Sequence, residues 1–296
     1  MSLHAPSGPQ DPIFIGGLSG SGKTQLRIVL GAHPDISMTR RTYLWNRFYG
    51  RFGPLDDCRN LDRCLRAMAA DRDVRTLDPD WDRIRSELFA GAVNYARLFG
   101  LVHDHHAQRL GKRRWGEQLR SVECFADPIF ATFPTARMIH LVRDPRVADA
   151  GARRPRGSSP GRLGWELAPW LQSAEIAQHN RLRYPGRYRV VSFETLEAHP
   201  VETVEELCAF VGEDLVPPMR RALATVRFPD TEPSRAAPLV DLYARRALAT
   251  LGYERTAPAL RREHLALALT AWPLNRASMT AWRLTRGDPL TRRART

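Results

Sequence analysis

A glycine-rich stretch near the start of the chain carries the residues best suited to hold a phosphate group. Residues 17–24 read GLSGSGKT and match the pattern GxxxxGK[ST], directly after an apolar run. Glycines let backbone N–H groups converge on an anion, and the start of a helix adds about half a positive charge there. Lys23 can reach a terminal phosphoryl or sulfuryl oxygen, and Thr24 offers a hydroxyl. The spacing therefore predicts a phosphate-binding loop whose binding residues are Ser19, Gly20, Ser21, Gly22, Lys23 and Thr24.

A second cationic candidate follows another buried-strand pattern. Residues 137–142 read RMIHLV, and Arg143 and Asp144 come directly after them. In sheets of parallel strands, ligands bind at the carboxyl ends of the strands, where both candidates fall. A guanidinium pairs with phosphate through charge-assisted, often bidentate hydrogen bonds. We therefore expect Arg143 to lie beside the loop.

The remaining patterns supply the elements that must position these residues. Strands are predicted at 12–16, 35–38, 113–118, 137–142 and 188–193, and helices at 24–32, 60–110, 122–133, about 165–183 and 201–211. A break at 77–80 divides the second helical region, where Asp78 or Asp80 caps the next helix. Strands that alternate with helices indicate an α/β fold with a mostly parallel sheet flanked by helices. Residues 153–164, RRPRGSSPGRLG, form a flexible, basic, turn-rich stretch.

Several motifs, in order, resemble those of PAPS-dependent sulfotransferases of the bacterial, P-loop type, where PAPS is 3′-phosphoadenosine 5′-phosphosulfate. Residues 12–34, PIFIGGLSGSGKTQLRIVLGAHP, are similar to the family's opening PIFIxGxPRSGTTLLRxxLxxHP. Residues 133–150, FPTARMIHLVRDPRVADA, resemble its element FPxAKFIHLVRDPRDVxxS. Further likenesses are RRWGE at 113–117, VVSFETL at 190–196 with LCAFVG at 207–212, and LGY at 251–253. The resemblance covers residues 12–254.

The resemblance implies a donor, a reaction and roles for individual residues. PAPS would be the donor and adenosine 3′,5′-bisphosphate the product, with no obligatory metal. The loop at 20–24 would hold the 5′-phosphosulfate, Lys23 would stabilise charge on the transferred group, and Arg143 would hold the 3′-phosphate. The acceptor is expected to be a hydroxyl of a small molecule, a secondary metabolite or a glycan. The helices at 60–110 and the stretch 153–164 would shape its pocket.

Four positions depart from the family pattern. Gly20 stands where the family has a cation, and Lys23 appears three residues later. Gln118 replaces the lysine of the family's GEKTP segment, and Phe193 replaces the tyrosine of its YE segment. Gly151 replaces a serine, for which Arg153 and Ser158 are the nearby substitutes as donor-binding residues.

The general base is the least determined role. Relatives carry an acidic residue shortly after the HP pair, but here that stretch is TRRTY at 39–43. Glu117 is the first candidate, the cluster HDHH at 103–106 the second and His140 the third, although a histidine inside an apolar strand is more often a core residue. Arg40, Arg41 and His105 are candidates for binding the acceptor. The HDHH cluster is expected to lie on a solvent-exposed helix, and its spacing does not match a zinc site.

Composition sets wider limits. The 296 residues carry a net charge of +13, and nine arginines against Glu263 and Asp288 place +7 of it in residues 255–296. The four cysteines form no CxxC pair and are expected to be free thiols. The chain shows no signal peptide and no membrane-spanning run, which predicts a cytoplasmic protein. We expect a flexible N-terminus at 1–11, one domain at 12–254 and a basic, partly helical extension at 255–296.

Three alternatives concern the extension. Its apolar segment 264–272 is predicted to be a helix that Pro273 ends. The extension packs on the domain, forms a homodimer, or contacts a membrane surface or nucleic acid. Packing on the domain is the favoured alternative, and nothing in the chain resembles a nucleic-acid-binding fold.

Two other functions compete with sulfuryl transfer. An ATP- and Mg²⁺-dependent small-molecule kinase would use the Walker-type lysine, and Asp144 is its only well-placed magnesium ligand. A non-catalytic nucleotide-binding protein on the same fold would explain the missing base and the two missing cations.

Overall fold

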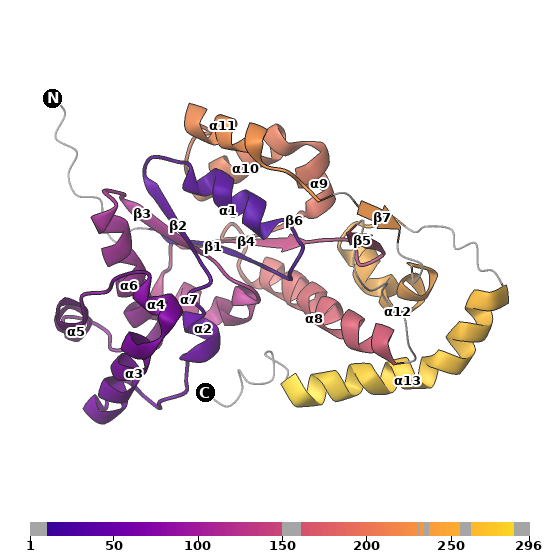
Figure 1. The fold of residues 1–296 in the computed structure, drawn as a ribbon, viewed down its shortest axis with the longest axis horizontal. Coiled ribbons are helices and arrows are strands. Elements are labelled where there is room, and N and C mark those ends of the chain that lie inside the picture. Colours follow the sequence, from indigo (N-terminus) through magenta and orange to yellow (C-terminus); the bar gives the residue numbers. More distant parts are fainter. Residues whose placement is uncertain (1–10, 150–160, 230, 234–236, 255–261, 287–296) are drawn as a thin grey trace.

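Five parallel strands form the central sheet, in the order β2-β3-β1-β4-β6 (Figure 1). They are β1 (Ile13–Gly17), β2 (Ile36–Arg40), β3 (Arg114–Gln118), β4 (Arg137–Val142) and β6 (Tyr188–Ser192). The computed structural model describes residues 11–149, 161–229, 231–233, 237–254 and 262–286. A separate antiparallel pair joins β5 (Val147–Asp149) to β7 (Thr231–Pro233). The predicted α/β fold is confirmed.

Helices cover both faces of the sheet (Figure 1). Side chains of β1 alternate between the two, because successive residues of a strand point to opposite faces. Ile13 and Ile15 pack with Leu26 in one apolar core, and Phe14 packs in the other. The helices are α1 (Lys23–Gly31), α2 (Leu44–Arg47), α3 (Cys58–Ala70), α4 (Arg72–Arg75), α5 (Trp81–Phe89), α6 (Tyr95–Arg109), η1 (Val122–Phe125), α7 (Ala126–Thr132), α8 (Arg162–Arg183), α9 (Phe193–Ala198), α10 (Pro200–Val211), α11 (Pro217–Thr225), α12 (Ala237–Thr250) and α13 (Arg262–Arg286).

The structure has helices in each predicted helical region, but their number and bounds differ in places. The region 60–110 divides into four helices, and Asp80 caps α5 by accepting a hydrogen bond from Arg83 N. Asp78 instead takes a positive φ of 48° in the turn before it. The sequence did not predict α2, α9, α11 and α12. Helix α8 begins at Arg162, inside the stretch predicted to be flexible, whose residues 153–160 lie outside the described residues.

The prediction that Pro273 ends a helix is wrong. Helix α13 runs through Pro273 to Arg286, although proline cannot donate a hydrogen bond to the preceding turn. Contacts made by residues immediately before and shortly after Pro273 hold the helix in place. Trp272 stacks on Tyr243 with ring centroids 4.7 Å apart, and Asn275 Oδ1 accepts a hydrogen bond from Gly164 N at 3.1 Å. Packing on α8 and α12 therefore outweighs the lost hydrogen bond.

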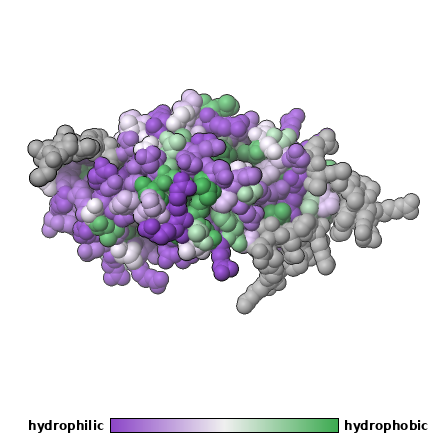
Figure 2. Space-filling model, turned by 90° about the horizontal axis from the view of Figure 1, so that it is seen from above, coloured by the Kyte–Doolittle hydropathy of each residue, from purple (hydrophilic) through white to green (hydrophobic). Residues whose placement is uncertain are grey.

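One face of the molecule illustrates how polar the described surface is. Figure 2 shows a mostly hydrophilic face with small hydrophobic patches between polar side chains. Among the described residues, no helix is both long and apolar enough to cross a bilayer. The four cysteines are free thiols, as predicted.

Candidate functional site

The glycine-rich loop between β1 and α1 has the backbone shape of an anion cradle. Gly17, Gly20 and Gly22 have φ values of 117°, 83° and 85°, which residues with a Cβ adopt only at a cost. Gly22 is the residue before α1, so the first free N–H groups of that helix face the loop. The loop is therefore built to present backbone donors to an anion.

Gly17 illustrates how closely the loop is packed. A Cβ at Gly17 would overlap the carbonyl oxygen of Leu141 on β4, whereas a Cβ at Gly186, which also has a positive φ (74°), would meet nothing within 4 Å. We expect Gly186→Ala to cost about 1 kcal/mol of stability, the left-handed backbone penalty alone. Gly17→Ala should cost at least about 2 kcal/mol more, because the backbone must also move. Urea unfolding measures both, and equal losses would contradict this packing.

Lys23 opens α1 and is almost covered, with 5% of its surface exposed. Its Nζ donates a hydrogen bond to the carbonyl oxygen of Leu18 within the loop. Burial lowers its pKa to about 8, the negative charge of Glu123 opposes this fall, and the positive charge of Arg120 adds to it. The ammonium is thus held inside the loop with little solvation of its own.

Glu123 lies beneath the loop and was not predicted from the sequence. It comes from η1, is 1% exposed, and its Oε2 accepts a hydrogen bond from Gly17 N at 2.9 Å. Its Oε1 lies 3.6 Å from His140 Nε2, and Asn180 Nδ2 donates to its backbone carbonyl at 2.9 Å. A Cβ at Gly16 would come within 2.5 Å of Oε2, so this glycine makes room for the carboxylate. Glu123 anchors the loop, and its negative charge favours the protonated form of Lys23.

Arg120 is a second residue that the sequence reading missed. It is exposed and comes two residues after β3, which pairs with β1 so that Gln118 is opposite Ile15. Continuing this register places Arg120 level with Gly17, and its charge depresses the pKa of Lys23. Gln118 and Gly20 lack the family's cations, and Arg120 brings a cation to the same edge.

These charges predict a pH dependence of anion binding. A protonated Lys23 binds a phosphate anion better than a neutral one, so affinity should fall as the pH rises above about 8. Glu123→Gln removes the charge that supports protonation, so the fall should begin about one pH unit lower. Arg120→Gln should move it upward. Calorimetric titration with adenosine 3′,5′-bisphosphate from pH 7 to 9.5 measures this change in affinity. If the affinity began to fall at the same pH in the unmodified protein and in both variants, Glu123 and Arg120 would have no influence on the pKa of Lys23.

Arg143 lies beside the loop, as expected. Its Nη1 donates a hydrogen bond to Gly20 O at 3.0 Å, and its guanidinium lies 4.6 Å from the ring centroid of Phe193. Trp170 Nε1 donates to the carbonyl of Arg143 at 2.8 Å. The Phe193 ring, at the family's tyrosine position, therefore supports the guanidinium from one side.

Asp144 has a structural role. Arg146 donates to both of its carboxylate oxygens at 2.7–3.0 Å and also pairs with Asp241 at 3.0 Å. The Asp144 N–H donates to Glu194 Oε1, and Tyr253 of the LGY motif donates to Glu194 Oε2. These bonds tie the segment after β4 to α9 and α12, and they occupy the Asp144 carboxylate with an arginine.

Glu117 is fully buried at the end of β3 rather than presented at the surface. Thr42 Oγ1 donates a hydrogen bond to its Oε1, and His103 Nε2 lies 3.5 Å from its Oε2. His103 stacks on Trp115 with ring centroids 4.8 Å apart. The carboxylate thus lies in a polar group enclosed by β2, β3 and α6.

The candidates His140 and His105 are also buried, and His106 is half-buried. Both ring nitrogens of His140 are engaged within the core, because Nδ1 is hydrogen-bonded to Tyr188 Oη at 2.6 Å and Nε2 to Ser173 Oγ at 2.9 Å. Burial lowers the pKa of His140. His105 is 2% exposed and lies 2.9 Å from Glu87 Oε2. The expectation of a solvent-exposed HDHH cluster is wrong for His103 and His105, because α6 is covered by β3 and α5.

The remaining candidates are two arginines at the end of β2 and two residues outside the described part of the chain. Arg40 ends β2 and Arg41 follows it with a positive φ of 55°, and both side chains are exposed. Arg153 and Ser158 lie outside the described residues. Among the described residues, no group of three or more His, Cys, Asp or Glu side chains is arranged to hold a metal ion.

Comparisons with solved structures show which known fold this chain shares. The chain matches the fold of the sulfotransferase domain from the curacin biosynthetic pathway, with 16% identity over 84% of this chain and 100% of that domain and a TM-score of 0.52. It also aligns with the sulfotransferase domain of the Synechococcus PCC 7002 olefin synthase (18% identity, 91% and 98% coverage, TM-score 0.47). A third alignment is with a sulfotransferase from Alicyclobacillus acidocaldarius (19% identity, 84% and 98% coverage, TM-score 0.45).

Curated protein sequences give no significant match. The family model described as "Sulfotransferase family" matches residues 12–217, a span that begins before β1 and includes the glycine-rich loop and Arg143. With this match over more than half of its length, and with the sulfotransferase fold around the loop, the chain belongs to the sulfotransferase family.

Proposed function

We propose that this protein transfers a sulfuryl group from PAPS to a hydroxyl of a small-molecule acceptor. The observation that carries the proposal is the glycine cradle at the start of α1 with Lys23 inside it and Arg143 at its rim. The two cations can neutralise two separate anionic groups of one ligand. PAPS has such groups at its 5′ and 3′ ends, so the residues present fit this donor.

Each group of the site has a defined task in this proposal. PAPS supplies an activated sulfuryl group, and the protein positions it and neutralises its oxygens. The N–H groups at 20–24 bind the 5′-phosphosulfate, and Lys23 exchanges the Leu18 carbonyl for a sulfuryl oxygen. Arg120 adds a second positive charge at the same edge, and Arg143 holds the 3′-phosphate.

The structure disfavours the kinase alternative on one point. A kinase needs a carboxylate that is free to bind Mg²⁺ beside the phosphates. The candidate, Asp144, gives both oxygens to Arg146. Binding Mg²⁺ there would require breaking this pair and leaving the buried guanidinium of Arg146 without its nearest partner.

We retain Glu117 as the hypothesis for the general base. An acceptor hydroxyl that took the place of the Thr42 hydroxyl would meet its Oε1. Glu117→Gln should then lower kcat about a hundredfold or more, the usual contribution of a general base. Affinity for adenosine 3′,5′-bisphosphate should stay within about twofold. Unchanged kcat in a folded Glu117→Gln protein would limit Glu117 to a structural role.

A direct assay tests the proposed reaction. The protein is incubated with PAPS and a panel of phenols, alcohols and sugars, and the release of adenosine 3′,5′-bisphosphate is followed by chromatography. We expect release that depends on one class of acceptor and persists in EDTA. No release of the bisphosphate with any acceptor would favour the non-catalytic alternative.

We further propose that the protein is a cytoplasmic enzyme of bacterial secondary metabolism or glycan modification, consistent with the fold shared with a domain from a biosynthetic pathway.

A further inference from the structure

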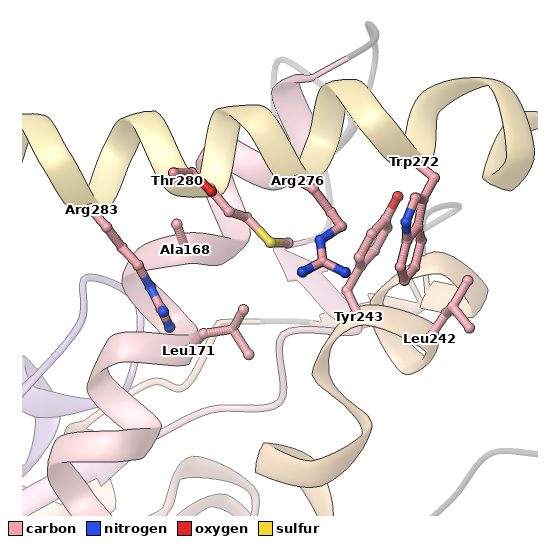
Figure 3. Close-up of a pocket in the computed structure, with 9 residues that line it drawn as sticks. Ala168, Leu171, Leu242, Tyr243, Trp272, Arg276, Thr280 and Arg283 are labelled. Carbon is pink, nitrogen blue, oxygen red and sulfur yellow. The ribbon is translucent and has the colours of Figure 1, made fainter.

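A hollow away from the phosphate loop lies where α13 crosses α8 and α12 (Figure 3). Its volume is about 310 Å³, which is within the range of pockets for small organic ligands. Its lining residues are Ala168, Leu171, Leu242, Tyr243, Trp272, Arg276, Met279, Thr280 and Arg283. Aliphatic and aromatic side chains thus share the lining with two arginines.

The two arginines give the hollow its charge. Arg276 and Arg283 are seven residues apart on α13, so two helical turns bring both guanidiniums toward the same side (Figure 3). Arg283 lies 3.9 Å from Glu175 Oε2, and each of these two side chains is more than half exposed. Arg276 has no ion-pair partner among the described residues, and its guanidinium lies 5.7 Å from the ring centroid of Trp272. The hollow therefore offers positive charge to an anion.

The aromatic wall favours a ligand with a flat apolar part. Trp272 and Tyr243 stack with their planes 17° apart, and Figure 3 shows both rings beside the Arg276 guanidinium. Leu171 on α8 and Leu242 on α12 lie across the hollow from α13. Leu242 is 50% exposed although it is a large apolar residue. A ring inserted here would cover apolar surface that now faces solvent, which favours binding.

The walls of the hollow are held in place. Asn275 accepts a hydrogen bond from Gly164 N on α8 and donates one to Tyr243 Oη on α12 at 3.1 Å. A Cβ at Gly164 would overlap the backbone of Asn275, so the two helices meet with backbone in contact. The contact between α8 and α13 fixes the position of α13 at Asn275, next to Arg276. Because this wall of the hollow is already ordered, little conformational entropy is lost when a ligand binds.

From these observations we propose that the hollow is a binding site for a small aromatic anion, a carboxylate or sulfate ester on a flat ring. The ring lies against Trp272 and Tyr243, and the anionic group pairs with Arg276 and Arg283. The site is distinct from the phosphate loop and does not depend on the proposed reaction.

Calorimetric titration with 2-naphthoate tests this site, with naphthalene-2-carboxamide as a neutral probe of the same shape. Adenosine 3′,5′-bisphosphate is present throughout in excess, so that the phosphate loop is not counted. We expect 2-naphthoate to bind with a Kd on the order of 0.1 mM and the carboxamide at least about tenfold more weakly. No binding of 2-naphthoate, or equal binding of both probes, would overturn the proposal.

Two variants and one control locate the site. Arg276→Gln and Arg283→Gln should each weaken 2-naphthoate about tenfold, because each removes one charge-assisted contact. Arg246 is an exposed arginine on α12 that does not line the hollow, and Arg246→Gln should change the Kd by less than about twofold. Equal effects of all three substitutions would show a general attraction to a basic surface, and unchanged affinity in both pocket variants would place the ligand elsewhere.

Discussion

Lys23→Ala should lower kcat for sulfuryl transfer by about a thousandfold, the largest effect that we expect from a single side chain. Its ammonium is the positive charge enclosed by the loop, and at 5% exposure water cannot replace it well. The Kd for adenosine 3′,5′-bisphosphate should rise by only about tenfold, because that product has no sulfuryl group and keeps the backbone donors. Single-turnover measurements with PAPS and the acceptor found in the panel separate the two effects.

The chain provides a matched control, because Lys112 is its other lysine. Lys112 Nζ donates hydrogen bonds to the carbonyls of His33 and Ile36, at 2.8 and 2.6 Å, in the turn between α1 and β2. Lys112→Ala should therefore lower thermal stability and leave kcat within about twofold. If Lys23→Ala kept its kcat, catalysis through this lysine would be ruled out.

Arg143→Ala should weaken adenosine 3′,5′-bisphosphate about a hundredfold, because a guanidinium that pairs with a phosphate contributes a charge-assisted, bidentate contact. Adenosine 5′-monophosphate lacks the 3′-phosphate, so its weaker binding should change by less than about threefold. Calorimetry with the two nucleotides measures the difference. This comparison assigns Arg143 to one end of the ligand, which a loss of activity alone would not do.

Two further variants sharpen that assignment. Arg143→Lys keeps the charge but not the planar fork, so it should recover only part of the affinity. Arg189 on β6 is a half-buried arginine paired with Glu206 at 2.6 Å, and Arg189→Ala should have no effect on either nucleotide. Equal losses for the bisphosphate and the monophosphate in Arg143→Ala would mean that Arg143 supports the loop and not the 3′-phosphate.

The sequence was sufficient for the sheet and the loop because their signals are local. An apolar run followed by GxxxxGKT specifies a strand, a turn and a helix within a dozen residues, and β1 and α1 lie where that pattern predicts. Arg143 could be placed beside Gly20 because parallel strands bring their carboxyl ends to one edge.

The surroundings of Lys23 depend on contacts between distant residues. Glu123 reaches Gly17 across 106 positions of sequence, and nothing in VECF at 122–125 marks it as a loop anchor. Arg120 could have been found by extending the β3 register past Gln118 toward the loop. Burial of Glu117, His103 and His105 depends on how α6 packs, which helical spacing does not determine.

The continuation of α13 through Pro273 has the same kind of cause. A proline inside a helix costs a hydrogen bond wherever it occurs, so a local rule ends the helix there. Stacking of Trp272 on Tyr243 and the bonds of Asn275 come from α8 and α12 and reverse that preference.

The proposed reaction requires a donor site that binds adenosine 3′,5′-bisphosphate, and calorimetric titration of the intact protein tests for this site most directly. The bisphosphate and, separately, ATP are titrated with and without Mg²⁺. We predict tight binding of the bisphosphate that does not depend on Mg²⁺, together with weak binding of ATP. Mg²⁺-dependent binding of ATP with no signal from the bisphosphate would contradict sulfuryl transfer from PAPS and favour the kinase.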